Sequence, residues 1–193
     1  RTIHYNKSKV EICRCGYTGE DGFELYLDLE LGKNIYQQLL DLSVADETIM
    51  LGGLLERDIL RLEAGLCLSG SEFGSEDKQV HFQDSNLNFI IGKKRRKDLG
   101  FIGDKNFLLE PSYQRVGFSS PRPVRPTEIY SSEDKEIGFI TSGIKSYSLD
   151  KFIGMGYVKK DYVNKNLYFK NKNKNYEIEL EELPFLENKY YRK

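Results

Sequence analysis

The sequence lacks tryptophan, carries almost no net charge and contains no long apolar run. None of its apolar runs approaches the roughly 18 residues from which a membrane-spanning helix is recognised, so we expect no such helix. The 29 lysines and arginines balance 30 aspartates and glutamates, which gives a net charge of −1. General nucleic-acid binders carry a clear basic excess, so this balance argues against that class of protein.

Metal-ligating and redox-active residues are scarce as well. The cysteines and histidines of the chain are Cys13, Cys15, Cys67, His4 and His81. A tetrahedral structural zinc site needs four closely grouped ligands, and these residues are not grouped in that way. We therefore predict no metal site, and reduced thiols in place of disulfides.

Several motifs of enzyme active sites are also missing. The sequence has no Gly-x-Ser-x-Gly nucleophile elbow, no phosphate-binding Gly-Lys-Ser/Thr loop and no Gly-x-Gly-x-x-Gly at the start of a helix. These absences set aside several classes of enzyme. Carboxylates, arginines and tyrosines remain, and this set of side chains suits the binding of a polar, planar, anionic ligand.

A turn framed by three glycines is the most informative feature that the chain does have. It occupies Gly16–Glu24, with the sequence GYTGEDGFE. Glycine tolerates positive φ, so these positions favour tight turns or bulges. Residues 23–27 then alternate as a strand does, which places Glu24 on a strand directly after the turn. A carboxylate in this position can bind a ligand through hydrogen bonds. The alternative is an acidic hairpin loop with no ligand, which would have the same sequence pattern.

The first half of the chain mixes strands and helices. We expect strands at Val10–Arg14 and Phe23–Asp28, and amphipathic helices at Leu31–Leu42 and Gly52–Leu66. Strands and helices in this order predict an α+β layer.

Two groups of cations stand out in this nearly neutral chain. Arg57 and Arg61 lie one turn apart on the second expected helix, where they either pair with neighbouring carboxylates in solvent or contact a ligand. Lys93–Lys97 is a run of five consecutive cations. We interpret this run as a basic surface loop that could steer an acidic partner; a localisation signal is the alternative.

The pattern of the chain changes near Glu110–Pro111, so we expect one domain at 1–110 and a second at 111–193. Beyond this boundary, short strands alternate with turn residues, which predicts a small antiparallel barrel or jelly roll. The expected strands are Arg115–Phe118, Glu128–Tyr130, Ile137–Thr141, Met155–Lys159, Leu167–Phe169 and Tyr176–Leu180.

Short motifs keep a characteristic order along nearly the whole chain. They are RCGYTGEDG at 14–22, ERDILRLEAGLCL at 56–68, GKKRR at 92–96, TSG at 141–143, MGYV at 155–158, LPF at 183–185 and YY at 190–191. With these motifs the chain resembles the aminomethyltransferase (T-protein) family of the glycine cleavage system.

The resemblance implies an enzyme that uses tetrahydrofolate as cofactor and the lipoylated H-protein as partner, with no nucleic acid or membrane. The implied reaction passes the aminomethyl group of the lipoyl arm to tetrahydrofolate, releasing ammonia and forming 5,10-methylenetetrahydrofolate. Carried over by position, Glu24 would bind the pterin ring and Tyr17 would help to enclose it. Arg57 would contact the anionic end of the folate, and Tyr190 would close the site from the barrel domain.

The resemblance also implies a fold: a ferredoxin-like and folate-binding α+β portion, followed by a C-terminal β-barrel. Family members are about twice as long, and the chain matches their C-terminal half. The catalytic aspartate of the family lies in the other half, so we expect the chain alone to be inactive. Absent strands would leave sheet edges and apolar faces uncovered. The basic run resembles that of eukaryotic members, so we expect a mitochondrial parent protein.

Other functions fit parts of the same pattern. One is the folate-binding domain of a sarcosine- or dimethylglycine-type oxidoreductase, which would carry a flavin domain before the folate part. Another is a non-catalytic folate-binding or iron–sulfur-assembly relative of the same fold, although no characteristic cysteine motif is recognised here. An RNA-binding module that uses Lys93–Lys97 is a further alternative, against which the neutral overall charge argues.

Overall fold

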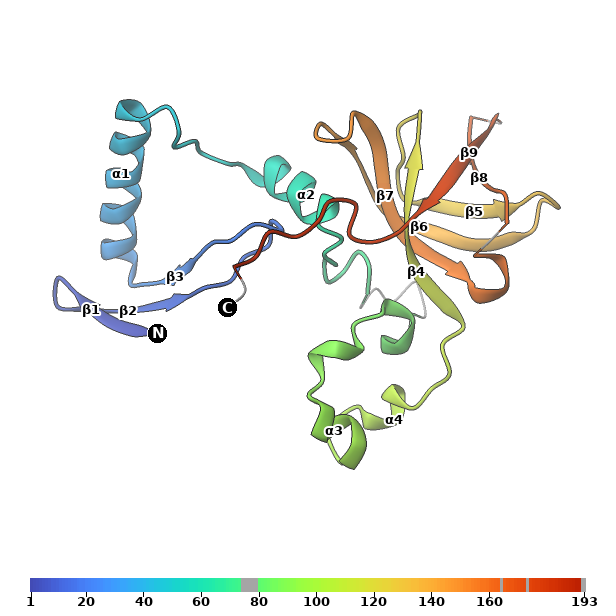
Figure 1. The fold of residues 1–193 in the computed structure, drawn as a ribbon, viewed down its shortest axis with the longest axis horizontal. Helices are drawn as coiled ribbons and strands as arrows, with labels where there is room; N and C mark the ends of the chain where they lie inside the picture. Colours follow the sequence, from blue (N-terminus) through green and yellow to red (C-terminus); the bar gives the residue numbers. More distant parts are fainter. Residues whose placement is uncertain (74–79, 164, 173, 192–193) are drawn as a thin grey trace. The chain divides into compact units, whose positions relative to one another are not determined.

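The structure is a computed structural model that describes residues 1–73, 80–163, 165–172 and 174–191 (Figure 1). By internal contacts the chain divides into unit 1, Arg1–Arg61 with Glu187–Lys193, and unit 2, Leu62–Leu186. The division falls inside one helix. The boundary expected near Glu110–Pro111 marks the start of the strand-rich pattern, and as a domain boundary it stays a prediction.

Unit 1 contains a three-stranded antiparallel sheet in the order β1-β2-β3. The strands are β1 (Thr2–Tyr5), β2 (Ser8–Cys13) and β3 (Glu24–Tyr26). Strand β3 is shorter than the predicted Phe23–Asp28, since only its residues 24–26 pair with β2. Strand β1 was not predicted.

The helix α1 (Leu29–Ala45) follows the sheet in sequence. It begins where the Asp28 side chain accepts a hydrogen bond from the Leu31 backbone N–H at 2.9 Å, as N-cap residues do. The next helix, α2 (Leu54–Glu63), begins where the Glu56 carboxylate accepts a hydrogen bond from the Gly53 N–H at 2.8 Å. Both helices were predicted from their apolar periodicity, with ends that differ by a few residues.

Unit 1 has little apolar core in its described part. Val10 and Leu31 are its only buried apolar side chains there, whereas Phe23, Leu29 and Leu54 are 63%, 72% and 86% exposed. Large exposed apolar side chains are common at protein interaction surfaces. The expected exposure of apolar side chains is therefore seen in this unit, and its origin in absent strands stays a prediction.

Unit 2 contains a closed antiparallel barrel in the order β4-β7-β6-β5-β8-β9. Its strands are β4 (Tyr113–Ser120), β5 (Thr127–Ser131), β6 (Glu136–Ser146), β7 (Lys151–Lys159), β8 (Leu167–Asn171) and β9 (Lys174–Glu181). All six neighbouring pairs are antiparallel. The predicted small antiparallel barrel is confirmed, with every expected strand present and most of them longer.

The barrel interior is filled by apolar side chains. They include Phe118, Ile129, Ile137, Ile140, Val158, Leu167 and Phe169. A second cluster packs Leu62 against Ile153 and Met155, and Leu183 and Phe185 contact it. The Leu183–Phe185 segment therefore closes over one side of the barrel within unit 2.

Between Leu62 and the first barrel strand the chain forms short helices. They are η1 (Phe82–Ser85), η2 (Asn88–Ile90), α3 (Lys93–Asp98) and α4 (Asp104–Phe107); a further short helix, η3 (Lys160–Tyr162), follows β7. The predicted basic loop at Lys93–Lys97 is wrong, because these residues form most of α3. Lysine and arginine are good helix formers, which accounts for the difference.

Buried carboxylates attach this connecting segment to the barrel. Glu63 accepts hydrogen bonds from Ser146 Oγ at 2.5 Å and from Ser148 Oγ at 3.2 Å. Glu72 accepts one from Thr141 Oγ1 at 3.2 Å. A buried carboxylate is tolerated only when its oxygens are hydrogen-bonded, so these acids have structural roles.

Glycines let β6 and β7 approach closely, which yields a first prediction. A Cβ added at Gly156 would lie 2.2 Å from Phe139 O across the ladder. Gly156→Ala should therefore force the strands apart and lower the free energy of unfolding by about 1–3 kcal/mol. The measurement is urea unfolding followed by tyrosine fluorescence.

Gly92→Ala is the matched control for this substitution. Gly92 has a φ of −53°, and a Cβ added there meets nothing within 4 Å. Its effect should stay within about 0.5 kcal/mol. Equal unfolding midpoints for the two variants would contradict the close-approach argument.

Candidate functional site

The glycine turn is braced by an ion pair between Arg14, which precedes it, and Asp21 within it. Arg14, directly after β2, donates from Nε to Asp21 Oδ1 at 2.9 Å, and from Nη2 to the other carboxylate oxygen. This two-point pairing matches the planar fork of guanidinium to a carboxylate. The hydrogen bonds from Arg14 hold the pKa of Asp21 below its ordinary value of 3.8, and they raise the pKa of Arg14.

The C-terminal tail returns to this turn within unit 1. The Lys189 N–H donates to Gly19 O at 2.8 Å, and Lys189 forms a parallel bridge with Glu20. Tyr191 then stacks under Arg14, with its ring centroid 4.1 Å from the guanidinium carbon. In Figure 1 the red tail accordingly ends beside the blue segment between β2 and β3.

Glu24, the predicted ligand-reading carboxylate, lies at the start of β3 and is half-buried. Its Oε2 accepts hydrogen bonds from Tyr26 Oη at 2.9 Å and from Cys15 Sγ at 3.4 Å. The hydrogen bond to Glu24 raises the pKa of Tyr26, and burial together with the same carboxylate raises the pKa of the Cys15 thiol. Two donors thus fix one oxygen, and Oε1 has no partner among the described residues.

Arg57 of α2 lies against Tyr17 of the glycine turn. The Arg57 guanidinium carbon lies 4.7 Å from the centroid of the Tyr17 ring. Within the described part of the chain no carboxylate pairs with Arg57, so its five N–H donors are not committed to an ion pair. Arg61, one turn further along α2, differs: it is buried and donates to Asp58 Oδ1 at 2.7 Å.

Tyr190 lies between two anchored residues of the tail. Lys189 is held by Gly19, and Tyr191 by Arg14, so the half-buried Tyr190 adjoins the glycine turn. All four predicted binding residues therefore belong to unit 1: Tyr17 and Glu24 lie in the glycine turn, Arg57 contacts Tyr17, and Tyr190 lies between two tail residues that contact the turn. Their roles toward a ligand stay predictions.

Sequence reasoning missed the residues that orient this group. Arg14 and Asp21 brace the turn, and Cys15 and Tyr26 fix the Glu24 carboxylate. A signal for the first pair was present, since opposite charges flank a glycine-rich turn. No comparable signal marks Cys15 or Tyr26, because their side chains reach Glu24 only after β2 and β3 pair.

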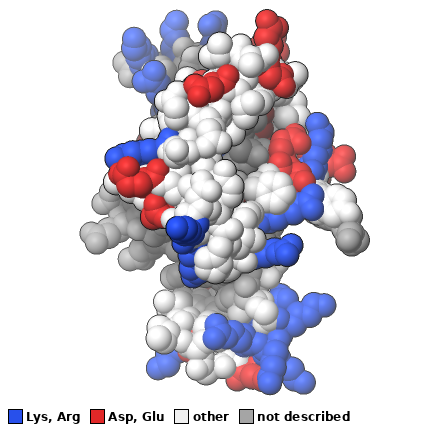
Figure 2. All heavy atoms as spheres, turned by 90° about the vertical axis from the view of Figure 1, so that its left-hand side faces the viewer, with Lys and Arg blue, Asp and Glu red and all other residues white. Residues whose placement is uncertain are grey.

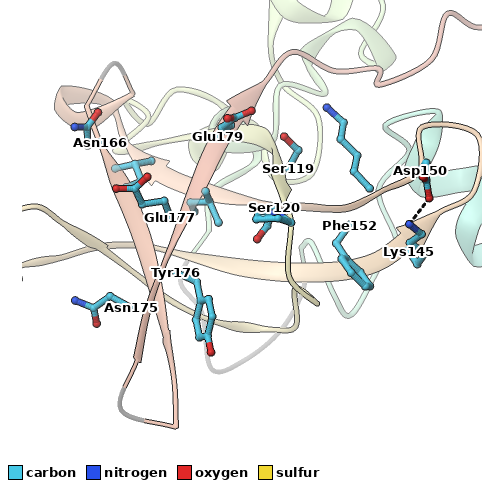
Figure 3. Close-up of a pocket in the computed structure, with 14 residues that line it drawn as sticks. Ser119, Ser120, Lys145, Asp150, Phe152, Asn166, Asn175, Tyr176, Glu177 and Glu179 are labelled. Carbon is cyan, nitrogen blue, oxygen red and sulfur yellow. Dashed lines mark hydrogen bonds and ion pairs between the residues drawn. The ribbon is translucent and has the colours of Figure 1, made fainter.

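A hollow of about 890 Å³ lies on the barrel, apart from these residues. Figure 3 shows Ser119, Ser120, Phe152 and Tyr176 around it, with Lys145 and Asp150 joined at one side. The Lys145–Asp150 ion pair has an N–O distance of 2.6 Å and lowers the pKa of Asp150. None of the four predicted binding residues lines this hollow, and both of its lysines already form ion pairs, Lys145 with Asp150 and Lys151 with Glu181.

Neither clusters of metal ligands nor membrane-spanning helices occur in the part of the chain that the structure describes. In residues 1–73, 80–163, 165–172 and 174–191, no group of three or more His, Cys, Asp or Glu side chains could hold a metal ion. No helix in the same part of the chain is long and apolar enough to cross a bilayer.

Comparison with known proteins identifies the family. The model of the GCVT N-terminal domain matches residues 1–95, and that of the glycine cleavage T-protein C-terminal barrel domain matches residues 114–187. The chain belongs to the glycine cleavage T-protein family. The matched barrel region coincides with β4–β9, and the glycine turn and α2 lie within the first match.

Named relatives and a solved structure agree with this assignment. The chain is 37% identical to a probable mitochondrial aminomethyltransferase of Schizosaccharomyces pombe, over 98% of this chain and 49% of the relative. It is 38% identical to the mitochondrial aminomethyltransferase of Solanum tuberosum, over 100% and 48%. The aminomethyltransferase T structure from Bartonella henselae matches with a TM-score of 0.86 and 31% identity, over 97% of this chain and 52% of that one. The chain thus spans about half the length of these relatives.

Acidification provides a test of the closed turn. The pKa of Asp21 is lowered in the folded state, so its stabilising contribution is complete above its ordinary value of 3.8 and is lost as the pH falls through the lowered value. Below that pH, Asp21 is protonated, so its ion pair with Arg14 should break. The hydrogen bond from the Tyr191 backbone N–H to the Asp21 carboxylate should weaken as well. NMR titration of the Arg14 Nε–H and Tyr191 amide signals measures this change.

Asp21→Asn is the control for the titration. An asparagine side chain does not titrate, so both signals should already have their released positions at neutral pH and should not move on acidification. Identical titrations of the variant and the original chain would contradict the role of Asp21.

Proposed function

We propose that this chain is the folate-binding part of an aminomethyltransferase of the glycine cleavage system. The reaction transfers the aminomethyl group from the lipoyl arm of the H-protein to tetrahydrofolate. Its products are 5,10-methylenetetrahydrofolate, ammonia and the reduced lipoyl arm. The arrangement of Glu24 beside the braced glycine turn is the observation that carries the proposal. The relatives reported above are named aminomethyltransferases, which favours this reaction over that of a folate-linked oxidoreductase.

Glu24 has the chemistry to bind the pterin ring. A pterin presents a 2-amino group and a ring N–H in one plane, and a carboxylate accepts two parallel hydrogen bonds from such a pair. Oε1 has no partner among the described residues, and Oε2 keeps acceptor capacity beyond its bonds to Tyr26 and Cys15. These two donors also hold the carboxylate in one orientation, so little side-chain freedom is lost on binding.

Arg57 and Tyr17 suit the rest of the folate. A guanidinium binds a carboxylate through two parallel N–H donors, which fits the anionic tail of the ligand. The contact with the Tyr17 ring orients this guanidinium without using its hydrogen-bond donors. Tyr17 also offers an aromatic surface to a planar ring, and Tyr190 on the anchored tail would close the site.

We also propose that the chain is inactive without the part of the family that it does not span. Chain coverage of 48–49% of the relatives leaves about half of their length unaccounted for. Exposed apolar residues such as Phe23, Leu29 and Leu54 supply a surface that this other part would cover. The catalytic aspartate that the family resemblance implies would come from there.

The cellular setting is part of the proposal. The relatives from S. pombe and S. tuberosum are named mitochondrial proteins, and we propose the same compartment for the parent of this chain. The partner would be the lipoylated H-protein.

A calorimetric titration with 5-formyltetrahydrofolate tests the assigned site. Hydrogen bonds to a charged group contribute about 1.5–3 kcal/mol, so Glu24→Gln should weaken binding roughly 10- to 150-fold. Glu47→Gln removes an exposed carboxylate of the same unit and should bind as the original chain does.

The titration separates several outcomes. Equal binding by the original chain and Glu24→Gln would remove Glu24 from its proposed role. Equal weakening by Glu24→Gln and Glu47→Gln would point to a general charge effect. No binding by the original chain would contradict the proposal that this chain is the folate-binding part of the enzyme.

A further inference from the structure

The segment Asn88–Leu109 concentrates positive charge in a chain that is otherwise acidic. It contains six lysines and arginines and two aspartates, a net charge of +4, whereas the whole chain carries −1 and the remainder therefore −5. Five of the six cations are consecutive and form most of α3. Figure 2 shows such side chains gathered at the lower end of the view, where Figure 1 places α3.

The cations of α3 are not neutralised within the described residues. No ion pair there involves Lys93, Lys94, Arg95, Arg96 or Lys97, although exposed cations elsewhere, such as Lys9 and Lys33, do pair. Lys93 and Lys97 lie four residues apart on one helix face, where like charges destabilise a helix. The Nε of the half-buried Arg96 also has no hydrogen-bond partner. Folding of this unit alone does not explain the concentration of charge.

Two large exposed apolar side chains lie close to the cations in sequence. Phe89 and Ile90 in η2 are 74% and 62% exposed and precede α3 by only a few residues. An apolar patch bordered by charge is typical of protein interaction surfaces, in which apolar groups contribute affinity and charges steer the encounter.

Aromatic contacts and hydrogen bonds attach the segment around α3 to the barrel. Phe107 contacts both Phe82 and Phe101, with ring centroids 6.4 and 6.2 Å apart. The buried Asp84 accepts hydrogen bonds from the His81 and Tyr113 N–H groups, each at 2.8 Å, and so ties η1 to the start of β4. The cations thus stand on an element that is anchored to the barrel within unit 2, and not on a free tail.

We propose that α3, Phe89 and Ile90 form the docking surface for an acidic protein, namely the lipoyl-bearing carrier of the reaction proposed above, on which this inference rests. Five uncompensated cations complement an acidic surface, and the exposed apolar pair would be buried at its centre. A nucleic acid or an anionic membrane is a weaker fit, because the remaining net charge of −5 repels an extended polyanion.

Charge reversal at the start of α3 tests the proposal. Lys93→Glu with Lys94→Glu keeps the helix, because carboxylates are favourable in a first helical turn. Binding of lipoylated H-protein to this chain is measured by calorimetry at low and at physiological salt. The double variant should bind at least about 10-fold more weakly than the original chain at low salt, and the difference should shrink as salt screens the charges.

The matched control reverses the same charge elsewhere on unit 2. Lys160 and Lys174 are exposed and have no ion pair among the described residues. Lys160→Glu with Lys174→Glu should leave H-protein binding within about twofold of the original. Circular dichroism of both variants checks that they are folded. Equal losses in the two double variants, or no loss in either, would overturn the assignment of α3.

Two further readouts separate this inference from the proposed function. Binding of 5-formyltetrahydrofolate should be the same with and without the α3 substitutions, so a failure at Glu24 and a failure at α3 are distinguishable. Vesicles of anionic phospholipid and a short RNA are offered to the same variants. If either binds in an α3-dependent way while H-protein does not bind, the acidic-protein assignment is overturned.

Discussion

The ion pair between Arg14 and Asp21 is the interaction on which the candidate site depends. It braces the glycine turn that holds Tyr17 beside Arg57, while the pairing of Cys13 with Glu24 sets Glu24 at the start of β3. The same guanidinium carries the ring of Tyr191, while Lys189 pairs with Gly19. One pairing therefore organises a loop near the start of the chain and the tail at its end. The groups that we assign to folate are held from two directions, as binding of a rigid ligand requires.

The two units solve different folding problems. The barrel of unit 2 closes on itself, leaves no free strand edge and fills its interior with residues such as Phe118 and Ile140. Unit 1 buries only Val10 and Leu31 among the apolar side chains of its described part. Since burial of apolar surface is the main favourable term in folding, the barrel is the self-sufficient part of the chain. The proposed folate site lies on the less complete unit, in keeping with a chain that spans about half the length of its relatives.

Most of the fold could be predicted from local patterns, and the exceptions have physical causes. The β-branched and aromatic residues of the barrel strands predict those strands, and the spacing of apolar residues predicts α1. Strand β1 was not predicted because its residues show too little alternation of apolar and polar side chains. The helix at Lys93–Lys97 was not predicted because its charge suggested a surface loop, although lysine and arginine favour helices. Glutamates are usually exposed, yet Glu63 and Glu72 are buried. Their hydrogen-bond donors, Ser146 and Thr141, lie 83 and 69 residues away in the sequence. Partners at such separations are visible only after the barrel has formed. In the site, the glycine turn pointed to Glu24, but the donors that orient it depend on strand pairing.

Our proposal is that this chain contributes the folate-binding part of an aminomethyltransferase and needs the remaining part of the family protein to act. It is tested most directly by mixing the chain with the half of the S. pombe relative that it does not cover, and measuring formation of 5,10-methylenetetrahydrofolate from aminomethyl-loaded H-protein and tetrahydrofolate. We expect no product from either part alone and product from the mixture. Product formation should fall strongly when the mixture contains Glu24→Gln. Activity of the chain by itself would contradict its proposed incompleteness. An associated but inactive mixture, or one that Glu24→Gln leaves fully active, would contradict the site.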